Sequence, residues 1–376
     1  MIICFECTAE VQEALQLLVQ KGRYRSRSEA ISSAILNMSL IQAHAAGRDA
    51  LVFTDEGRQT RRLAGASRKG VPGAATSPMP RAEPEMPPVF LLPGIADEKI
   101  RTMPSVAESE PKSGSQPSLK SWLFGQYNKF LPIKANTRAL AHFTSTSSRG
   151  VSLNDASRAI AREAAKLGQY LERCDRQNGT GKDDALATAF PVNSKDPEKA
   201  LIRYAQHFVG AFSSTRQPTG FLACLKFIQV SDTEPERVLL TEAALRFALM
   251  PNPILDSQSD EGHRADGSRK FSDDEQALLR EHIMRSVPVE RCAYTTIASA
   301  VSAGAVSPDK IDAWLISRAR HLEIEITPGF VATQRSGAIS RMADLGLIAR
   351  HRSGLQVTYA LSASGQALFE HADRDS

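Results

Sequence analysis

Ten prolines lie in the stretch between residues 54 and 118, where they interrupt any helix. Glycine, serine and alanine recur between the prolines, and the stretch has too little apolar surface to offset the conformational entropy lost on folding. We therefore expect a flexible linker there, with folded parts on either side. Hydrophobic residues make up 42% of the 376-residue chain, which is enough for such parts to have cores.

Three regions outside this stretch have the apolar and capping patterns of folded structure, namely 1–45, 120–256 and 271–372. Their patterns are mostly helical with a few short strands, so we expect a mainly α protein with small β elements. The predicted linker, residues 54–118, begins with a basic cluster: Arg58, Arg61, Arg62, Arg68 and Lys69. That cluster is either a solvated tether or an arm that makes nonspecific contacts with phosphates.

Residues 1–45 have the pattern of one short strand followed by two helices. Side chains over residues 2–7 alternate as they do in a strand. A helix with an apolar stripe follows and ends at Gly22. Ser26-x-x-Glu29 then forms a capping box, which predicts the start of the second helix.

This strand, the two helices and the turn sequence Gly-Arg-Tyr-Arg-Ser-Arg-Ser-Glu-Ala-Ile resemble the ribbon-helix-helix family. The resemblance implies a homodimer through residues 1–45, because two strands must pair to complete the ribbon and its small core. It also implies that outer strand residues enter the major groove, although Ile2, Cys4 and Glu6 are poor partners for base edges. The candidates for holding a DNA phosphate at the start of the second helix are Arg25, Arg27 and Ser28.

Residues 271–372 have the pattern of several helices followed by a β-hairpin. A capping box at 272–275 and a Ser-Pro pair at 307–308 mark the starts of two helices. A further helix over 333–345 is followed by a strand, a basic turn and a return strand over 347–359.

This order of elements resembles a winged helix, most clearly over residues 340–348. The resemblance implies that the helix over 333–345 enters the major groove of double-stranded DNA and that the basic turn contacts the backbone or the minor groove. The residues so assigned are Gln334, Arg335, Ser336, Ser340 and Arg341 on the helix, and Arg350 and Arg352 in the turn. Arginine and glutamine suit these roles because each can form paired hydrogen bonds with a base. Winged helices also serve as protein–protein modules, which is the alternative.

Residues 120–256 have the pattern of a degenerate second winged helix. A strand at 238–239 followed by a capped apolar helix echoes the end of the 271–372 region. The hairpin over 231–236 is acidic and would be repelled by phosphates, so we expect this copy to contact protein or its partner copy. Aromatic residues and lysine are interleaved over 122–130, where they form either a surface for single-stranded nucleic acid or an anchor in a core.

No local pattern indicates catalysis, a metal or a cofactor. The chain lacks H-E-x-x-H, G-x-S-x-G and a glycine-rich dinucleotide turn, and Cys4 and Cys7 have no second pair with zinc-ligand spacing. Five scattered cysteines do not make a disulfide framework, and no apolar stretch is long enough to cross a membrane. We therefore expect a non-enzymatic protein of the bacterial cytoplasm.

The main hypothesis from the sequence is a dimeric DNA-binding protein, such as a transcriptional regulator or a plasmid or mobile-element factor. Its N-terminal module would dimerise and its C-terminal winged helix would read duplex DNA. The first alternative is a scaffold or adaptor of a larger assembly, in which the winged helices and the face formed by Ile2, Cys4 and Glu6 bind a further protein. The second alternative is an antitoxin-like protein, because ribbon-helix-helix modules often serve that role.

Overall fold

The computed structural model describes residues 85–92, 105–106, 118–145, 149–181, 184–192, 195–231, 234, 236–256 and 270–372, and the isolated helical positions 16 and 20. The predicted ribbon-helix-helix region, with Arg25, Arg27 and Ser28, otherwise lies outside the described residues. The chain divides into the units 1–79 and 80–376, and the second unit is described here. It is mainly helical with a few small sheets, as predicted. None of the described helices is long and apolar enough to cross a membrane.

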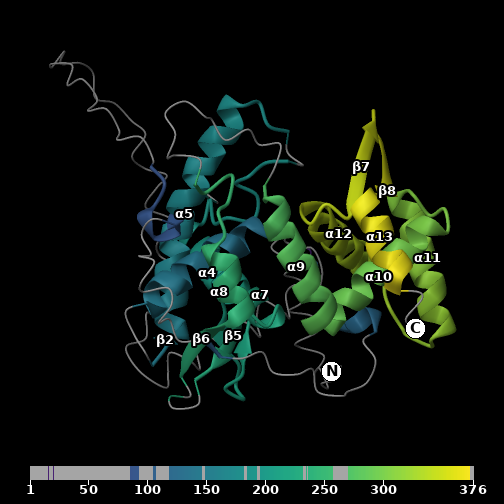
Figure 1. Ribbon diagram of the computed structural model, residues 1–376. Coiled ribbons are helices and arrows are strands. Elements are labelled where there is room, and N and C mark those ends of the chain that lie inside the picture. The colour runs from purple at the N-terminus through teal and green to yellow at the C-terminus, as the bar shows by residue number, and fades with distance from the viewer. Residues whose placement is uncertain are drawn as a thin grey trace. The chain divides into compact units, whose positions relative to one another are not determined.

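The first half of this unit is a group of helices with a small sheet (Figure 1). Its helices are η2 (Pro88–Phe90), η4 (Leu119–Ser121), α4 (Leu131–Thr144), α5 (Leu153–Gln177), α6 (Pro197–Tyr204), the π-helix η5 (Ala205–Val209), α7 (Phe221–Cys224) and α8 (Glu242–Leu249). Its strands are β1 (Ser105–Val106), β2 (Val151–Ser152), β3 (Ala211–Phe212), β4 (Pro218–Thr219), β5 (Ile228–Val230) and β6 (Arg237–Thr241). Strand β6 pairs in parallel with β1 and antiparallel with β2 and β5, while β3 and β4 pair with each other.

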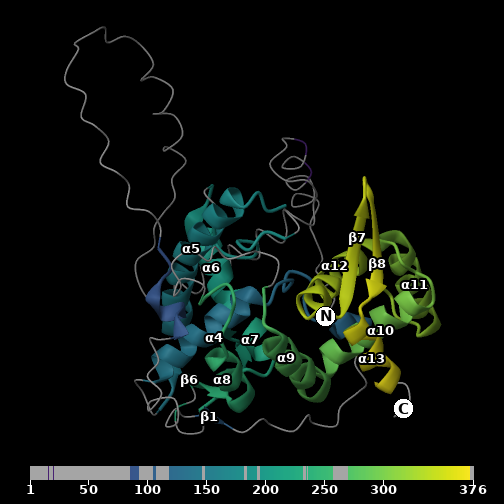
Figure 2. The ribbon, with the colours of Figure 1, turned by 45° about the horizontal axis from the view of Figure 1, so that its top comes forward.

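The second half has five helices among its described residues and one hairpin, which extends beyond the helices (Figures 1 and 2). The elements are α9 (Asp273–Ser286), α10 (Pro288–Ser302), α11 (Pro308–His321), α12 (Pro328–Asp344), β7 (Ile348–Ser353), β8 (Gln356–Leu361) and α13 (Ala363–Ala372). The predicted capping box at 272–275 and the N-cap at Ser307 are both present.

Two boundaries in this half differ from the prediction. Helix α12 begins at Pro328 rather than 333, because the Thr327 side chain caps it and a proline fits the first turn. Strand β7 continues to Ser353, so the predicted basic turn is part of the strand, and the reversal falls at Gly354 with φ +60°.

The two halves share part of one order of elements, although α6, η5, β3 and β4 of the first half have no counterpart in the second. In the first half, β2 follows α4 and pairs with β6, the second strand of its hairpin. In the second half, Val306 lies between α10 and α11 and accepts a 2.8 Å hydrogen bond from the N–H of Tyr359 in β8. Each hairpin leads into a helix capped by a hydroxyl, from Thr241 before α8 and from Ser362 before α13. These caps confirm the predicted echo of strand, cap and apolar helix.

Helix α4 is buried on nearly every side and carries two cations into the core. Lys134 donates hydrogen bonds to the carbonyl groups of Phe247 and Met250 at the end of α8, and its Nζ lies 2.8 Å from the carboxylate of Glu275. Burial lowers the pKa of Lys134 to about 8, although Glu275 acts in the opposite direction. The end of a helix and a carboxylate both attract a cation, so this buried charge is compensated.

Arg138 lies one turn further along α4 and is also fully buried. It donates hydrogen bonds to the carbonyl groups of Ala248 and Phe90 and forms a two-pronged ion pair with Asp256, with N–O distances of 2.7 and 2.6 Å. This one side chain therefore joins η2, α4, the end of α8 and the chain that follows α8.

The contact with Phe90 corrects the predicted linker of residues 54–118. The Phe90 ring is fully buried although it lies in a proline-rich stretch. Strand β1, in the same stretch, pairs with β6 of the small sheet. The prediction of a flexible linker is therefore wrong for residues 85–92 and 105–106. Local composition misses them because their packing partners lie far along the chain: Arg138 is 48 residues beyond Phe90, and Ser105 of β1 pairs with Leu240 of β6.

Replacing Lys134 with Met should lower the free energy of unfolding by about 3–5 kcal/mol, because the buried carboxylate of Glu275 then loses its cation. The measurement is the denaturant midpoint of the full-length chain by circular dichroism. Lys166→Met is the matched control, since Lys166 pairs with Glu163 on the surface and such pairs contribute at most about 1 kcal/mol. An unchanged midpoint for Lys134→Met would show that the buried pair does not stabilise the fold.

Asp256 should make the fold sensitive to acid. Burial raises the pKa of its carboxyl, but hydrogen bonds from Arg138 and from the N–H groups of Asn252 and Leu92 outweigh burial and hold the pKa below its ordinary value of 3.8. The stabilisation is therefore present above that ordinary value and is lost as the pH falls through the lower pKa of the folded state. The Tm difference between wild type and Asp256→Asn should narrow in that window, and a pH-independent difference would contradict this assignment.

Candidate nucleic-acid interface

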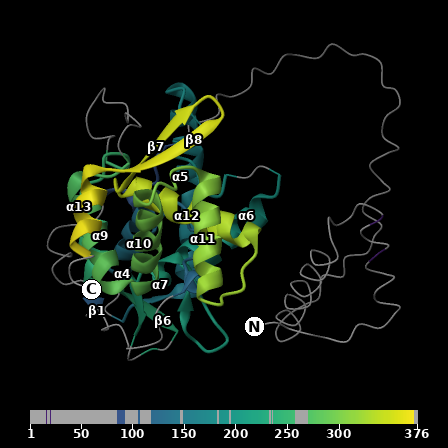
Figure 3. The same cartoon turned by 90° about the vertical axis from the view of Figure 1, so that its right-hand side faces the viewer.

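Helix α12 carries most of the residues that the sequence assigned to DNA, and its surroundings decide which of them are accessible. It packs against α10 and α11 and precedes β7 (Figure 3). Its remaining long face is covered by residues 118–130, which we call the covering segment. η4 of this segment lies among the C-terminal helices, although the segment leads directly into α4 (Figure 1).

Arg341 is fully buried and forms a two-pronged ion pair with Glu290 of α10. Its third hydrogen bond goes to the carbonyl oxygen of Tyr127 in the covering segment. Burial alone would lower the pKa of Arg341, but Glu290 and Tyr294 raise it above its ordinary value. The prediction that Arg341 faces a DNA groove is therefore wrong for this structure, because its guanidinium group joins two buried elements.

Gln334 and Arg335 are also engaged within the protein. The Gln334 side chain is buried, and its Nε2 lies 3.5 Å from the carbonyl oxygen of Trp122. Arg335 donates to both carboxylate oxygens of Asp312 in α11, at 2.7 and 3.3 Å. Ser336 is exposed and Ser340 is half-buried. The part of α12 that faces solvent therefore offers small and hydroxyl side chains rather than unpaired cations.

Two glycines bring the covering segment and α12 into backbone contact. A methyl group on Gly337 would lie 2.6 Å from the carbonyl oxygen of Gly125 and 2.7 Å from its Cα atom. At the end of the helix, the Asp344 carboxylate accepts a 3.0 Å hydrogen bond from the N–H of Phe130. The segment thus follows α12 from Gln334 to Asp344, with one polar contact or backbone approach on successive turns.

The aromatic residues of the covering segment mostly point into the core. Trp122 and Phe130 are buried, and Tyr127 stacks on Phe221 with ring centroids 4.8 Å apart. Phe124 is the exception among the aromatics of this segment and remains partly exposed. The interpretation of residues 122–130 as an anchor in a core therefore describes this segment better than a surface for single-stranded nucleic acid.

Sequence reasoning missed Glu290, Gly125 and Gly337, which define this contact. A glycine within a helix costs about 1 kcal/mol relative to alanine, so Gly337 in an otherwise regular helix was a usable signal of close backbone approach. Glu290 gave a weaker signal, because a carboxylate in the first turn of α10 is also explained by the helix dipole.

The hairpin β7–β8 is where the predicted site residues remain exposed. Arg350, His351 and Arg352 are exposed on β7, and Leu355 at the tip is fully exposed. Alternation along a strand places Arg350 and Arg352 on one face of the ribbon and His351 on the other. The hairpin extends past the ends of the neighbouring helices (Figures 2 and 3), so these side chains can approach a large partner.

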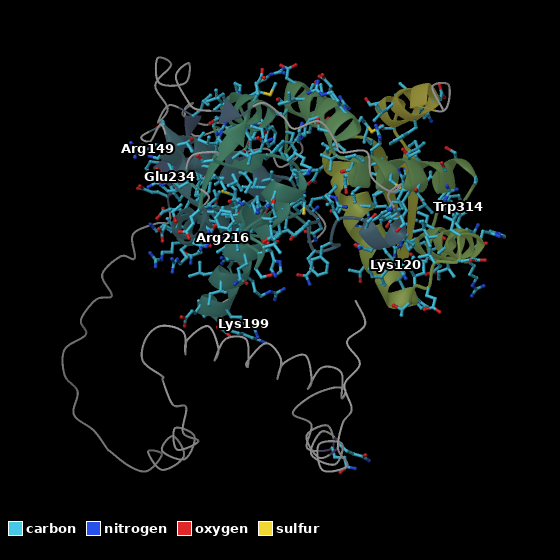
Figure 4. The ribbon with its side chains drawn as sticks, turned by 90° about the horizontal axis from the view of Figure 1, so that it is seen from below. Lys120, Arg149, Lys199, Arg216, Glu234 and Trp314 are labelled. Atoms are coloured by element: carbon cyan, nitrogen blue, oxygen red, sulfur yellow. The ribbon has the colours of Figure 1, made fainter. Side chains whose placement is uncertain are left out.

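A second basic surface lies on α11. Lys310, Arg318 and His321 are exposed there, and the guanidinium of Arg318 lies 5.5 Å from the ring centroid of half-buried Trp314. Figure 4 shows Trp314 at the outer edge of the C-terminal helices, and Lys120 of η4 is labelled over the same group of helices. By contrast, the hairpin between β5 and β6 has Glu234 paired with Arg237 at 2.6 Å and with Arg149 at 3.7 Å.

In the part of the chain that the structure describes, no group of three His, Cys, Asp or Glu side chains is placed to hold a metal ion.

Gly337→Ala should lower the free energy of unfolding by about 1–3 kcal/mol, because the new methyl group forces the covering segment to move. Gly329→Ala in the same helix is the matched control, since a methyl group there meets no described atom within 4 Å. That control should leave stability unchanged or raise it slightly, because alanine favours helix. Urea unfolding of the full-length chain measures both, and equal stabilities would contradict the proposed backbone contact.

The functional interpretation depends on this geometry. No protein-family model, curated protein or solved structure matches the chain.

Proposed function

We propose that the protein binds double-stranded DNA without enzymatic activity, and that residues 288–361 act as a winged helix whose hairpin makes the contact. The observation that carries the proposal is the exposed pair Arg350 and Arg352 on one face of a hairpin that extends from the helices. The hydrogen bond from the N–H of Tyr359 to the carbonyl oxygen of Val306 supports the proposal. It adds Val306 to the hairpin as a third strand position, between α10 and α11.

The DNA contact is thereby placed on the β7–β8 hairpin, which is the wing of the proposed winged helix, rather than on α12. The cations of α12 are engaged in ion pairs, with Arg335 on Asp312 and Arg341 on Glu290. Arginines on a wing contact mainly phosphates and the minor groove, which gives affinity with little base selectivity. Selectivity would then come from a second module, and the proposed homodimer through residues 1–45 would supply it by placing two chains on one duplex.

A second candidate function is that of an adaptor that uses its winged-helix module for protein contacts. The observation that favours it is that α12 packs against another segment of the same protein, the covering segment. The helix is therefore already used for a protein contact in this structure. The exposed apolar side chains Leu322 and Leu355 suit further contacts of this kind.

The test compares DNA binding by the full-length wild type and the Arg350→Ala/Arg352→Ala variant across a salt series. If both arginines contact phosphates, the variant should bind more weakly and its log–log salt slope should fall by about 2. The matched control is Arg176→Ala/Arg285→Ala, which removes two exposed arginines from α5 and α9, each paired with a glutamate one turn away.

Equal weakening by both double variants would mean that only net charge matters. The absence of duplex binding at low salt would overturn the DNA proposal and favour the adaptor. The full-length chain is essential in these measurements, because a fragment that starts at residue 271 would expose the face of α12 that carries Arg341.

A further inference from the structure

A cavity of about 530 Å³ opens beside α6 and the covering segment. Its polar lining includes Gln126, Asn128, Lys199, Arg203 and His207. This volume is within the range of small-molecule sites in proteins. Figure 4 shows Lys199 on the first half of the unit, separate from Lys120 and Trp314 beside the C-terminal helices.

Three basic side chains of the lining come from one helical face. Lys199, Arg203 and His207 recur every four residues along α6 and η5, so they align on the cavity side. The last of them lies in a π-helical turn, a feature that is frequent at functional sites because it disrupts regular helix packing. Burial and the nearby charge of Arg203 lower the pKa of His207, which favours its neutral form.

The acidic residue of the lining does not offset these cations fully. Asp196 is the N-cap of α6, and its Oδ1 accepts a 3.1 Å hydrogen bond from the N–H of Lys199. One carboxylate therefore faces two permanent cations. Arg203 also donates a 3.2 Å hydrogen bond to Gln126, which holds its guanidinium group at the rim.

Another part of the cavity lining is apolar. It includes Ala189, Phe190, Pro191 and Phe208, and the Phe190 ring stacks on Tyr204 with centroids 6.1 Å apart. A ligand that fills the cavity therefore needs an anionic end and an apolar body. Arginine binds phosphate through paired hydrogen bonds and lysine binds it as a point charge, so the two together suit a doubly charged phosphate better than a single carboxylate.

We propose that this cavity binds a small organic phosphate monoester, with the phosphate held by Lys199 and Arg203 and the organic part against Phe190 and Pro191. The site is separate from the DNA contact proposed on β7, and it stands or falls independently of that contact. Its occupant would touch Gln126 and Asn128, which belong to the same segment that covers α12. Occupancy therefore adds contacts to the covering segment and couples the cavity to the C-terminal helices.

The test is calorimetric titration of the full-length protein with phenyl phosphate. We expect saturable binding of one molecule per chain, with weaker binding of inorganic phosphate and none of phenol. Dimethyl phosphate, a diester that mimics the nucleic-acid backbone with a single charge, should bind at least tenfold more weakly. Comparable binding of the diester would overturn the monoester assignment and indicate a nucleic-acid contact instead.

Arg203→Met should weaken phenyl phosphate binding at least tenfold, whereas Arg203→Lys should restore part of it because the charge returns. Arg158→Met is the matched control, since Arg158 is an exposed helix arginine that bonds to Asp155 and lies outside the cavity lining. Circular dichroism checks that each variant is folded. Absence of binding at millimolar phenyl phosphate, or equal loss in Arg203→Met and Arg158→Met, would overturn the proposal.

Discussion

The charges that α4 carries into the core determine how the rest of the unit is arranged. Lys134 and Arg138 are fully buried, and a buried charge is tolerated only when every partner is in place. Those partners come from η2, from the last carbonyl groups of α8 and from the carboxylates Asp256 and Glu275. Since each partner belongs to a different part of the chain, the parts gain their stabilisation together.

Arg341, in the second half, is a further buried cation whose charge is compensated by partners from separate parts of the chain. Its charge is matched by Glu290 within its own half and by the carbonyl group of Tyr127 from the other half. The two halves resemble each other in part of the order of their elements, yet each takes a partner for a buried cation from the other. Lys134 of the first half pairs with Glu275, and Arg341 of the second half donates to the carbonyl group of Tyr127. The two halves therefore share a pattern in sequence, but they do not fold independently of each other. It also means that α12, the element with the strongest sequence likeness to a DNA reader, is used here to join the halves.

Local signals were predicted well from the sequence because they involve neighbours along the chain. The capping box of Ser272 and Glu275, the Ser307 N-cap and the caps after both hairpins are present as expected. Long-range contacts were not predicted, for a physical reason: an arginine that pairs with a carboxylate 51 residues away has the same side chain as one that binds DNA. The exposed Arg350 and the buried Arg341 therefore look alike in sequence, and only packing separates them. The same limit applies to Phe90, whose burial depends on Arg138 and α4 rather than on the prolines beside it.

The contact between Gly125 and Gly337 has a consequence for how the covering segment can move. Main chain lies against main chain there, so no side-chain rotamer is available to fill a gap that opens by a fraction of an ångström. A partly separated state would lose van der Waals contact before water could enter the space. Any separation of the segment from α12 therefore gives up main-chain packing at Gly125 and Gly337, and a side chain at either position would collide with the opposite main chain.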